Sequence, residues 1–298
     1  MSSTPPTAVP TGAAGPWSRY VALGDSFTEG LWDLPDPARP DRLRGWADIL
    51  AGRLAGRLAA GPTPGDDADD AGSTDGGADG LVDDGLVYAN LAVRGRLLGA
   101  IVEEQLPEAL ALGPDLVSLV GGGNDLLRPG SDPDALADIL EGAVVRVRAT
   151  GADVLLATGM DPHGSPLLRA TRARVAVYNA HVWSLARRHG ASVMDVWGMR
   201  SLRDWRMWAP DRIHLTTAGH ERVAQAALVA LGVGADDTAW DDPLAPLPPV
   251  ARAERLRSDL LWARQYATPW IGRRLRRRSS GDTRPPKHAE PVVLTPRT

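Results

Sequence analysis

The sequence predicts an α/β protein in which a five-stranded parallel sheet lies between two layers of helices. Short apolar runs of strand length alternate with amphipathic stretches of ten residues or more, as in βαβ units. The chain has 298 residues, 43% of them hydrophobic, so it can bury a sizeable core. Polar or glycine-rich clusters follow three of the apolar runs, which is typical of strands that end at one ligand-binding edge of a sheet.

The expected elements can be placed from apolar spacing and from capping residues. The expected strands are the apolar runs at 20–23, 86–89, 115–120, 153–157 and 192–196. The expected helices occupy residues 43–58, 97–112, 132–149, 165–189 and 217–231. Asp132 followed by Pro133 is a helix-capping pair, and Thr216 or Thr217 caps the last helix. Pro107 predicts a kink or a boundary inside the second helix.

Three segments fall outside this pattern. Residues 1–18 are rich in Pro, Thr, Ala and Gly and are expected to be disordered, whereas residues 61–85 hold eight Asp and no Lys or Arg and predict an acidic flexible loop. Residues 233–298 are expected to form a linker, a basic amphipathic helix and a disordered tail. The main domain is therefore expected over residues 19–232.

The composition excludes several classes of site. There is no cysteine, so disulfides, iron–sulfur clusters, thiolate zinc sites and a cysteine nucleophile are excluded. No spacing typical of a metal or phosphate site occurs, so we expect neither a metal nor a cofactor. The amino terminus lacks the features of a secretory signal, and no apolar run approaches the roughly 18 residues of a membrane span, which favours a cytoplasmic protein.

Three short motifs carry the chemistry of the chain. They are Gly-Asp-Ser at 24–26, Gly-Gly-Asn-Asp at 122–125 and Asp-Arg-Ile-His at 211–214. The first two follow expected strands, so the sheet should bring them to one edge. A serine hydroxyl needs an imidazole to take its proton, and a carboxylate three residues before a histidine can orient that imidazole. In this order the motifs indicate a serine-dependent hydrolytic site.

With Asn-Leu-Ala-Val-Arg-Gly at 90–95, these motifs resemble the SGNH/GDSL hydrolase (lipase/esterase) superfamily over residues 19–232. The resemblance implies a flavodoxin-like SGNH hydrolase fold with Ser26 as nucleophile, His214 as base and Asp211 as orienting acid. It also implies an oxyanion hole made by the backbone N–H groups of Ser26 and Gly95 and the side-chain amide of Asn124. The superfamily often has a further glycine at the position of Ala92, which puts only the local loop shape in doubt.

The residues that border the substrate are less defined. Trp32, His163 and Trp208 are candidates for the rim of the substrate site. Trp197, Trp205 and Trp208 precede the Asp-Arg-Ile-His motif and could form an apolar or sugar-stacking wall, although we favour a role in covering the core under a long loop. His220 is expected to serve packing.

The carboxy-terminal segment is strongly basic. Residues 251–298 hold twelve Arg or Lys against four Asp or Glu, and residues 251–267 have an amphipathic pattern. Contact of this segment with an anionic membrane surface is an alternative, but we favour a helix docked on the domain with a solvated tail. Contact of the basic tail with the acidic loop is a further alternative, which salt would screen. Nucleic acid is not an expected partner.

The sequence thus predicts a serine esterase that cleaves carboxylic esters through an acyl-enzyme, without a cofactor. Alternatives within the same chemistry are acyl transfer, lysophospholipase activity and deacetylation of carbohydrates. An alternative of another class is a catalytically silent binding module with a basic tail, although the full set of site residues argues against it. A small-molecule, lipid or sugar ester is the expected substrate.

Overall fold

The computed structural model describes residues 17–36, 38–39, 42–60, 85–165, 168–269, 272 and 281–295. The expectations for residues 1–16, for the acidic segment 61–84 and for the arginine-rich run 273–278 lie outside the described residues. Trp17 and Ser18, which the sequence placed in a disordered terminus, belong to the folded part. The indole Nε1 of Trp17 donates to Asp153 (2.9 Å), and the backbone N of Ser18 donates to Asp115 (2.7 Å).

A six-stranded sheet forms the centre of the molecule, with strand order β5-β4-β3-β1-β2-β6. The first five strands are mutually parallel, and β6 runs antiparallel to β2. The strands are β1 (Arg19–Gly24), β2 (Leu86–Asn90), β3 (Leu116–Val120), β4 (Asp153–Ala157), β5 (Ser192–Met194) and β6 (His288–Leu294). Within this flavodoxin-like order, the switch point lies between β1 and β3, where ligands are expected to bind.

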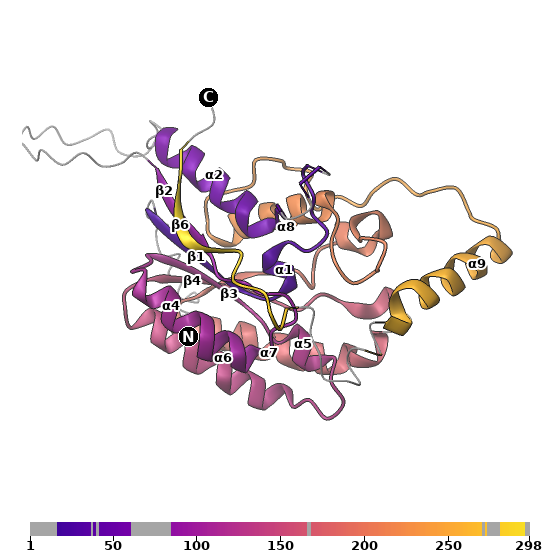
Figure 1. Cartoon of the computed structure of the whole chain (residues 1–298), viewed down its shortest axis with the longest axis horizontal. Helices are drawn as coiled ribbons and strands as arrows, with labels where there is room; N and C mark the ends of the chain where they lie inside the picture. Colours follow the sequence, from indigo (N-terminus) through magenta and orange to yellow (C-terminus); the bar gives the residue numbers. More distant parts are fainter. Residues whose placement is uncertain are drawn as a thin grey trace, which may run out of the picture.

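Helices cover both faces of the sheet (Figure 1). Helices α2 and α8 lie on one face, and α4, α6 and α7 lie on the other. The helices are α1 (Ser26–Glu29), α2 (Trp46–Ala60), α3 (Leu98–Ala100), α4 (Leu106–Ala111), α5 (Gly123–Leu126), α6 (Pro133–Arg148), α7 (Arg172–His189), α8 (Thr217–Ala230) and α9 (Arg252–Trp262), with π-helical turns at Ile101–Gln105 and Ala263–Ala267.

Two hydrophobic clusters, one on each face of the sheet, form the core. Trp46 and Leu50 of α2 pack with Val223 and Leu228 of α8 on the first face, and all four are fully buried. On the second face, buried leucines and valines of α4, α6 and α7 cover the strands. The three-layer α/β/α fold predicted from the sequence is confirmed, and its two layers hold the carboxyl ends of β1 and β3 in fixed positions.

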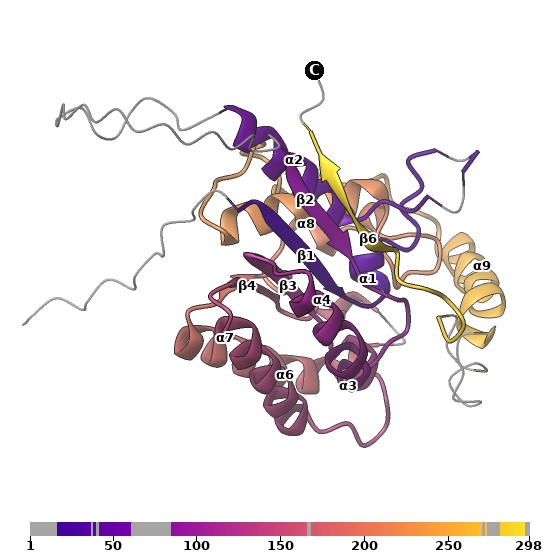
Figure 2. The ribbon, with the colours of Figure 1, turned by 60° about the vertical axis from the view of Figure 1, so that its left-hand side comes forward.

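The predicted strand count of five is corrected to six, because the tail adds β6. Leu294 pairs with Leu86 and Val292 with Tyr88, which makes β6 an edge strand beside β2 (Figure 2). Pro291 lies inside β6 and cannot donate a ladder hydrogen bond, which an edge strand tolerates. The predicted disorder of the tail is therefore wrong for residues 288–294.

Two predicted helices differ from the observed ones. The helix predicted to begin at Ser165 begins at Arg172, after short 3₁₀ turns at Pro162–Gly164 and Arg169–Thr171. The stretch 97–112 divides into α3, a π-helical turn and α4, and Pro107 lies in the first turn of α4. Within the described ranges, none of the helices has both the length and the apolar composition that a transmembrane segment requires.

Candidate active site

The segment after β1 makes a tight turn that carries Ser26. The carboxylate of Asp25 caps α1 by accepting a hydrogen bond from the backbone N of Phe27 (3.0 Å). A Cβ atom at position 24 would collide with the side chain of Thr28 and lie 2.8 Å from the carbonyl oxygen of Val120, so only glycine fits there. The turn therefore places Ser26 at the carboxyl end of β1, next to β3.

A continuous chain of hydrogen bonds joins Asp211, His214 and Ser26. The Nε2 atom of His214 lies 2.9 Å from Ser26 Oγ, and its Nδ1 atom lies 2.6 Å from Asp211 Oδ2. The other carboxylate oxygen of Asp211 accepts from the backbone N atoms of Ile213 and His214, both at 3.0 Å. The turn that ends at His214 thus fixes the carboxylate and the imidazole relative to each other.

The charge of Asp211 is stabilised by the same contacts. Burial by itself would raise the pKa of this carboxyl group, but the hydrogen bond and charge of His214 and the two backbone N–H groups hold the pKa below its ordinary value. Asp211 therefore stays ionised, as a partner of an imidazole that takes up a proton must.

The neighbouring Asp25 is in the opposite situation. Burial raises the pKa of Asp25 to about 6, although the N–H of Phe27, the charge of His214 and the amide of Asn124 lower it in part. The carboxylate of Asp25 accepts hydrogen bonds from the backbone N of Phe27 and from the side-chain amide of Asn124. Its role is therefore to shape the turn that presents Ser26.

Besides Ser26 itself, the structure brings the other two predicted oxyanion donors, Gly95 and Asn124, near this turn. Gly95 lies in the loop after β2 with a φ of 76°, a conformation that favours glycine. This loop is held by Val93 N, which donates to Gly24 O (3.2 Å), and by Arg94 N, which donates to the carboxylate of Glu29 (2.8 Å). In contrast, Asn124 Nδ2 donates to Asp25 Oδ2 (2.9 Å) and to Arg96 O (3.2 Å).

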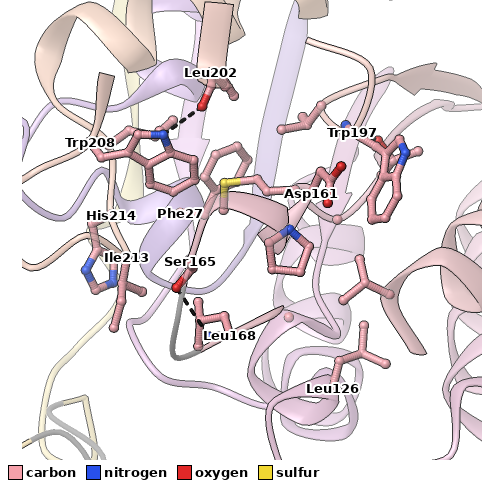
Figure 3. Close-up of a pocket in the computed structure, with 18 of the residues that line it drawn as sticks. Phe27, Leu126, Asp161, Ser165, Leu168, Trp197, Leu202, Trp208, Ile213 and His214 are labelled. Atoms are coloured by element: carbon pink, nitrogen blue, oxygen red, sulfur yellow. Dashed lines mark hydrogen bonds between the residues drawn. The ribbon is translucent and has the colours of Figure 1, made fainter. Parts of the chain in front are cut away.

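A cavity of about 510 Å³ extends from Ser26 and His214 over the carboxyl ends of the strands. Figure 3 shows His214 and Ile213 at one end of the view and Trp197 and Leu126 at the other. Most of the wall is apolar and aromatic. Such a wall suits an aliphatic or aromatic part of a substrate, because binding there removes the apolar surface of both the substrate and the wall from water.

Two of the three predicted rim residues lie at this cavity. His163 and Trp208 line it, and so do Trp197 and Trp205. Trp208 is held by its indole Nε1, which donates to Leu202 O (2.8 Å; Figure 3). Trp32 does not line the cavity. It borders a separate pocket and packs edge-on against Tyr266, because the chain turns away from Ser26 after α1.

Several residues that support the site carry no sequence signal. The side-chain amide of Gln105 bonds both the backbone N and the carbonyl oxygen of Gly24, at 2.9 and 3.0 Å. Glu29, the buried last residue of α1, pairs with the guanidinium of Arg94 next to Gly95. These contacts join residues that are far apart in the chain, and no local spacing could reveal them.

His220, which also borders the cavity, is buried against α2. Its Nδ1 accepts from the backbone N of Trp46 (3.2 Å), and burial lowers its pKa to about 3. His220 is thus neutral. Among the described residues, no group of three or more His, Asp or Glu side chains could hold a metal ion.

Comparison with known proteins identifies the family of the chain. Residues 22–222 match the model of the GDSL-like lipase/acylhydrolase family, which is more than half of the chain. The chain belongs to this family. It is an ester-hydrolysing enzyme, and the resemblance that the sequence motifs indicated is confirmed. No curated protein matches the chain.

Solved structures of similar fold include hydrolases. An α/β hydrolase from the metagenome of Lake Arreo, LAE5, is 25% identical with a TM-score of 0.54, over 72% of this chain and 95% of its own. A variant of the acetyl xylan esterase Axe2 from Geobacillus stearothermophilus is 18% identical with a TM-score of 0.56, over 74% of this chain and 97% of its own. TesA is 23% identical with a TM-score of 0.50, over 72% of this chain and 97% of its own.

Proposed function

We propose that this GDSL-family hydrolase is a serine esterase that cleaves carboxylic esters through an acyl-enzyme on Ser26. The observation that carries the proposal is the chain of hydrogen bonds from Asp211 through His214 to Ser26 Oγ, with lengths of 2.6 and 2.9 Å. Both lengths are within the range in which a proton can pass to a general base.

The steps follow from this geometry. His214 Nε2 takes the proton of Ser26 Oγ while the oxygen attacks the ester carbonyl, and the resulting imidazolium is stabilised by Asp211. The tetrahedral intermediate then expels the alcohol, which receives the proton from His214. Water repeats the sequence on the acyl-enzyme, with His214 again as base, and releases the acid and free Ser26.

The developing oxyanion needs donors that are in place before the reaction. We assign this role to the backbone N–H groups of Ser26 and Gly95 and to the amide of Asn124. Gly95 supports the assignment because it lies in a loop bonded to the nucleophile turn. Asn124 must exchange its bond to Asp25 or Arg96 for a bond to the oxyanion, a rearrangement that unliganded sites commonly require.

The apolar wall of the cavity favours esters whose acyl part is an aliphatic chain. The side chains of Leu168, Leu202 and Trp208 line the same cavity as Ser26 and offer an alkyl chain no hydrogen-bonding partner. An acetyl group would leave most of the roughly 510 Å³ cavity unfilled.

The test is hydrolysis of p-nitrophenyl esters from acetate to palmitate by wild type and by Ser26→Ala in parallel. We expect the variant to lose about 10³-fold or more in kcat, and a fluorophosphonate probe to label only the wild type. Equal activity of the two proteins, or labelling of the variant, would overturn the role of Ser26.

A further inference from the structure

Helix α9 lies beyond the family match yet contacts the turn between Asp211 and His214. The indole Nε1 of Trp262 donates to the carbonyl oxygen of Asp211 (3.1 Å). The guanidinium of Arg212 donates to Asp259 (2.7 Å) and lies over the ring of Trp262, 4.9 Å from its centroid. One helix thus holds two consecutive residues of the turn by three different contacts.

The backbone of this turn needs such support. Arg212 has a φ of 58°, in the left-handed region that residues with a side chain rarely adopt. A conformation of this kind persists where the surroundings fix it. Arg212 also lies over Trp205 on the cavity side, 5.9 Å from the ring centroid. If the backbone of Arg212 relaxed to a negative φ, Asp211 would move relative to His214, because Arg212 lies between these two residues in the chain.

We propose that α9 is a positioning element of the catalytic turn, with Asp259 and Trp262 as its positioning residues. The proposal rests on the proposed roles of Asp211 and His214. Asp259 and Trp262 act through Arg212 and through the backbone of Asp211, and neither touches the reacting atoms. Loosening them therefore lowers kcat by a larger factor than it changes KM, because most of the cavity wall lies on other segments.

The experiment compares Asp259→Asn and Trp262→Phe with wild type in kcat, KM, the rate of fluorophosphonate labelling and Tm. Small displacements of catalytic groups cost up to about 10²-fold, so we expect kcat and the labelling rate to fall about tenfold at unchanged Tm. Asp259→Glu, which keeps the charge, should restore part of the rate. Glu254→Gln, on the exposed surface of the same helix, is the matched control.

The outcomes separate this proposal from the one on which it rests. If Ser26→Ala is inactive while Asp259→Asn and Trp262→Phe keep wild-type kcat and labelling rates, α9 has no positioning role. If kcat and Tm fall together in these variants and Asp259→Glu does not restore kcat, α9 only stabilises the fold. If Ser26→Ala is as active as wild type, the serine mechanism itself fails.

The outer side of α9 presents a second, independent feature. Leu256, Leu260 and Leu261 are 60, 63 and 67% exposed, so these leucines do not pack on the domain, although α9 contacts it through Asp259 and Trp262. At the 100° per residue of an α-helix, Arg257 falls among them, and Arg264 follows two residues after α9, in the π-helical turn that continues it; both arginines are exposed. We call Leu256, Arg257, Leu260, Leu261 and Arg264 the outer face of α9, which lies at one end of the molecule (Figure 1).

We infer that the outer face of α9 binds an anionic lipid surface. Leucines that enter the boundary of the acyl chains while arginines meet the phosphates are the composition of interfacial helices. A second copy of this chain fits less well, because it would bring Arg257 and Arg264 against the same positive charges. Nucleic acid would leave the leucines in water. Since α9 contacts the catalytic turn, such binding holds the site close to esters in the lipid layer.

The test is cosedimentation of the full chain with phosphatidylcholine vesicles that contain or lack phosphatidylglycerol. We expect binding only to the anionic vesicles, and a loss of about tenfold or more in affinity when the three leucines become serine. Val145→Ser with Val177→Ser is the matched control, since these valines are similarly exposed on α6 and α7.

The lipid proposal would be wrong if the wild type did not bind the anionic vesicles, or if the leucine variant bound them equally well. It would also be wrong if sedimentation equilibrium showed that the wild type dimerises and the leucine variant does not, because the outer face would then be an interface between copies. None of these outcomes depends on catalysis by Ser26.

Discussion

The ammonium group of Lys287 donates a 2.8 Å hydrogen bond to the carbonyl oxygen of Glu29, across 258 residues of sequence. Lys287 is the only lysine of the chain, and its side chain is 8% exposed. It also pairs with Asp48 Oδ2 of α2 at 2.6 Å. The segment before β6 is therefore fastened to the end of the helix that begins with Ser26.

This contact predicts a large loss of stability in Lys287→Met. Removing one partner of a buried ion pair leaves the other charge without compensation, which costs about 3 kcal/mol. The free energy of unfolding from urea titration measures the effect. Arg39→Met is the control, because the Arg39–Asp36 pair is more than half exposed and should contribute less than about 1 kcal/mol. Equal losses in the two variants would contradict the prediction.

Long-range contacts such as that of Lys287 leave no local pattern in the sequence, and for this reason the fold was predicted only in part. The five parallel strands are apolar runs that end at turn residues, and a sequence displays such runs directly. The strand β6 has the sequence His-Ala-Glu-Pro-Val-Val-Leu, follows an irregular stretch and lies at an edge, where hydrophobic alternation is not required. Its pairing depends on a distant partner, β2, and that dependence leaves no local pattern.

The same distinction applies to the candidate site. Ser26, Asn124 and His214 lie in short motifs next to strand ends or helix caps, so the sequence could single them out as candidates. Gln105, Glu29 and Trp262 act through contacts with residues dozens of positions away, and each looks like an ordinary helix residue in the sequence. Trp32 was predicted at the rim of the substrate site because it follows Ser26 closely in sequence. It borders a separate pocket instead, so closeness in sequence was misleading here.

Asp211→Asn should lower kcat by about 10³–10⁴-fold with little change in KM, because the amide cannot stabilise the imidazolium or fix its tautomer. Steady-state kinetics on the best p-nitrophenyl ester measures the loss. Asp134→Asn, which removes an exposed carboxylate from α6, should leave kcat unchanged. Asp211 would have no orienting role if its variant stayed within tenfold of wild type.

The buried His220 predicts a specific sensitivity to acid. The unfolded chain takes up a proton at His220 near its ordinary pKa of 6.5, whereas the folded protein resists protonation down to about 3. The stability that neutral His220 contributes is therefore fully present above pH 6.5 and is lost as the pH falls towards 3. In His220→Gln the glutamine can still accept from Trp46 N but does not titrate. The free energy of unfolding of this variant should therefore fall less between pH 7 and pH 4 than that of wild type, by up to about 3 kcal/mol.

Urea titrations at several pH values give this difference directly. His181→Gln on α7 supplies the control: it replaces a histidine outside the core and leaves His220 in place, so the loss of stability that His220 causes should persist in this variant. Parallel pH dependences of wild type and His220→Gln would show that His220 does not contribute to acid sensitivity.

The apolar cavity predicts how activity depends on acyl length. Each methylene that enters it removes about 0.8 kcal/mol of unfavourable contact with water, so kcat/KM should rise about threefold to fourfold per methylene until the cavity is filled. Leu168→Trp narrows the cavity and should lower activity on long esters by more than about tenfold while sparing acetate. Leu247→Trp, at an exposed position, is the control. A parallel decrease for all esters would place the acyl chain elsewhere.

Asn124 provides the sharpest test of the oxyanion site, because its amide already bonds Asp25 and Arg96 in the absence of substrate. If Asn124 moves to the oxyanion during the reaction, Asn124→Ala should lower kcat by about 10²–10³-fold and leave KM nearly unchanged, since the bond exists only in the transition state. If Asn124 only holds Asp25, the loss of kcat should stay below tenfold. Asn179→Ala is the matched control, because the amide of Asn179 bonds the backbone of Gly159 in the cavity wall. We expect the larger loss, because the oxyanion has three lone pairs and the backbone N–H groups proposed at Ser26 and Gly95 would use two of them, which leaves one for the amide of Asn124 in α5.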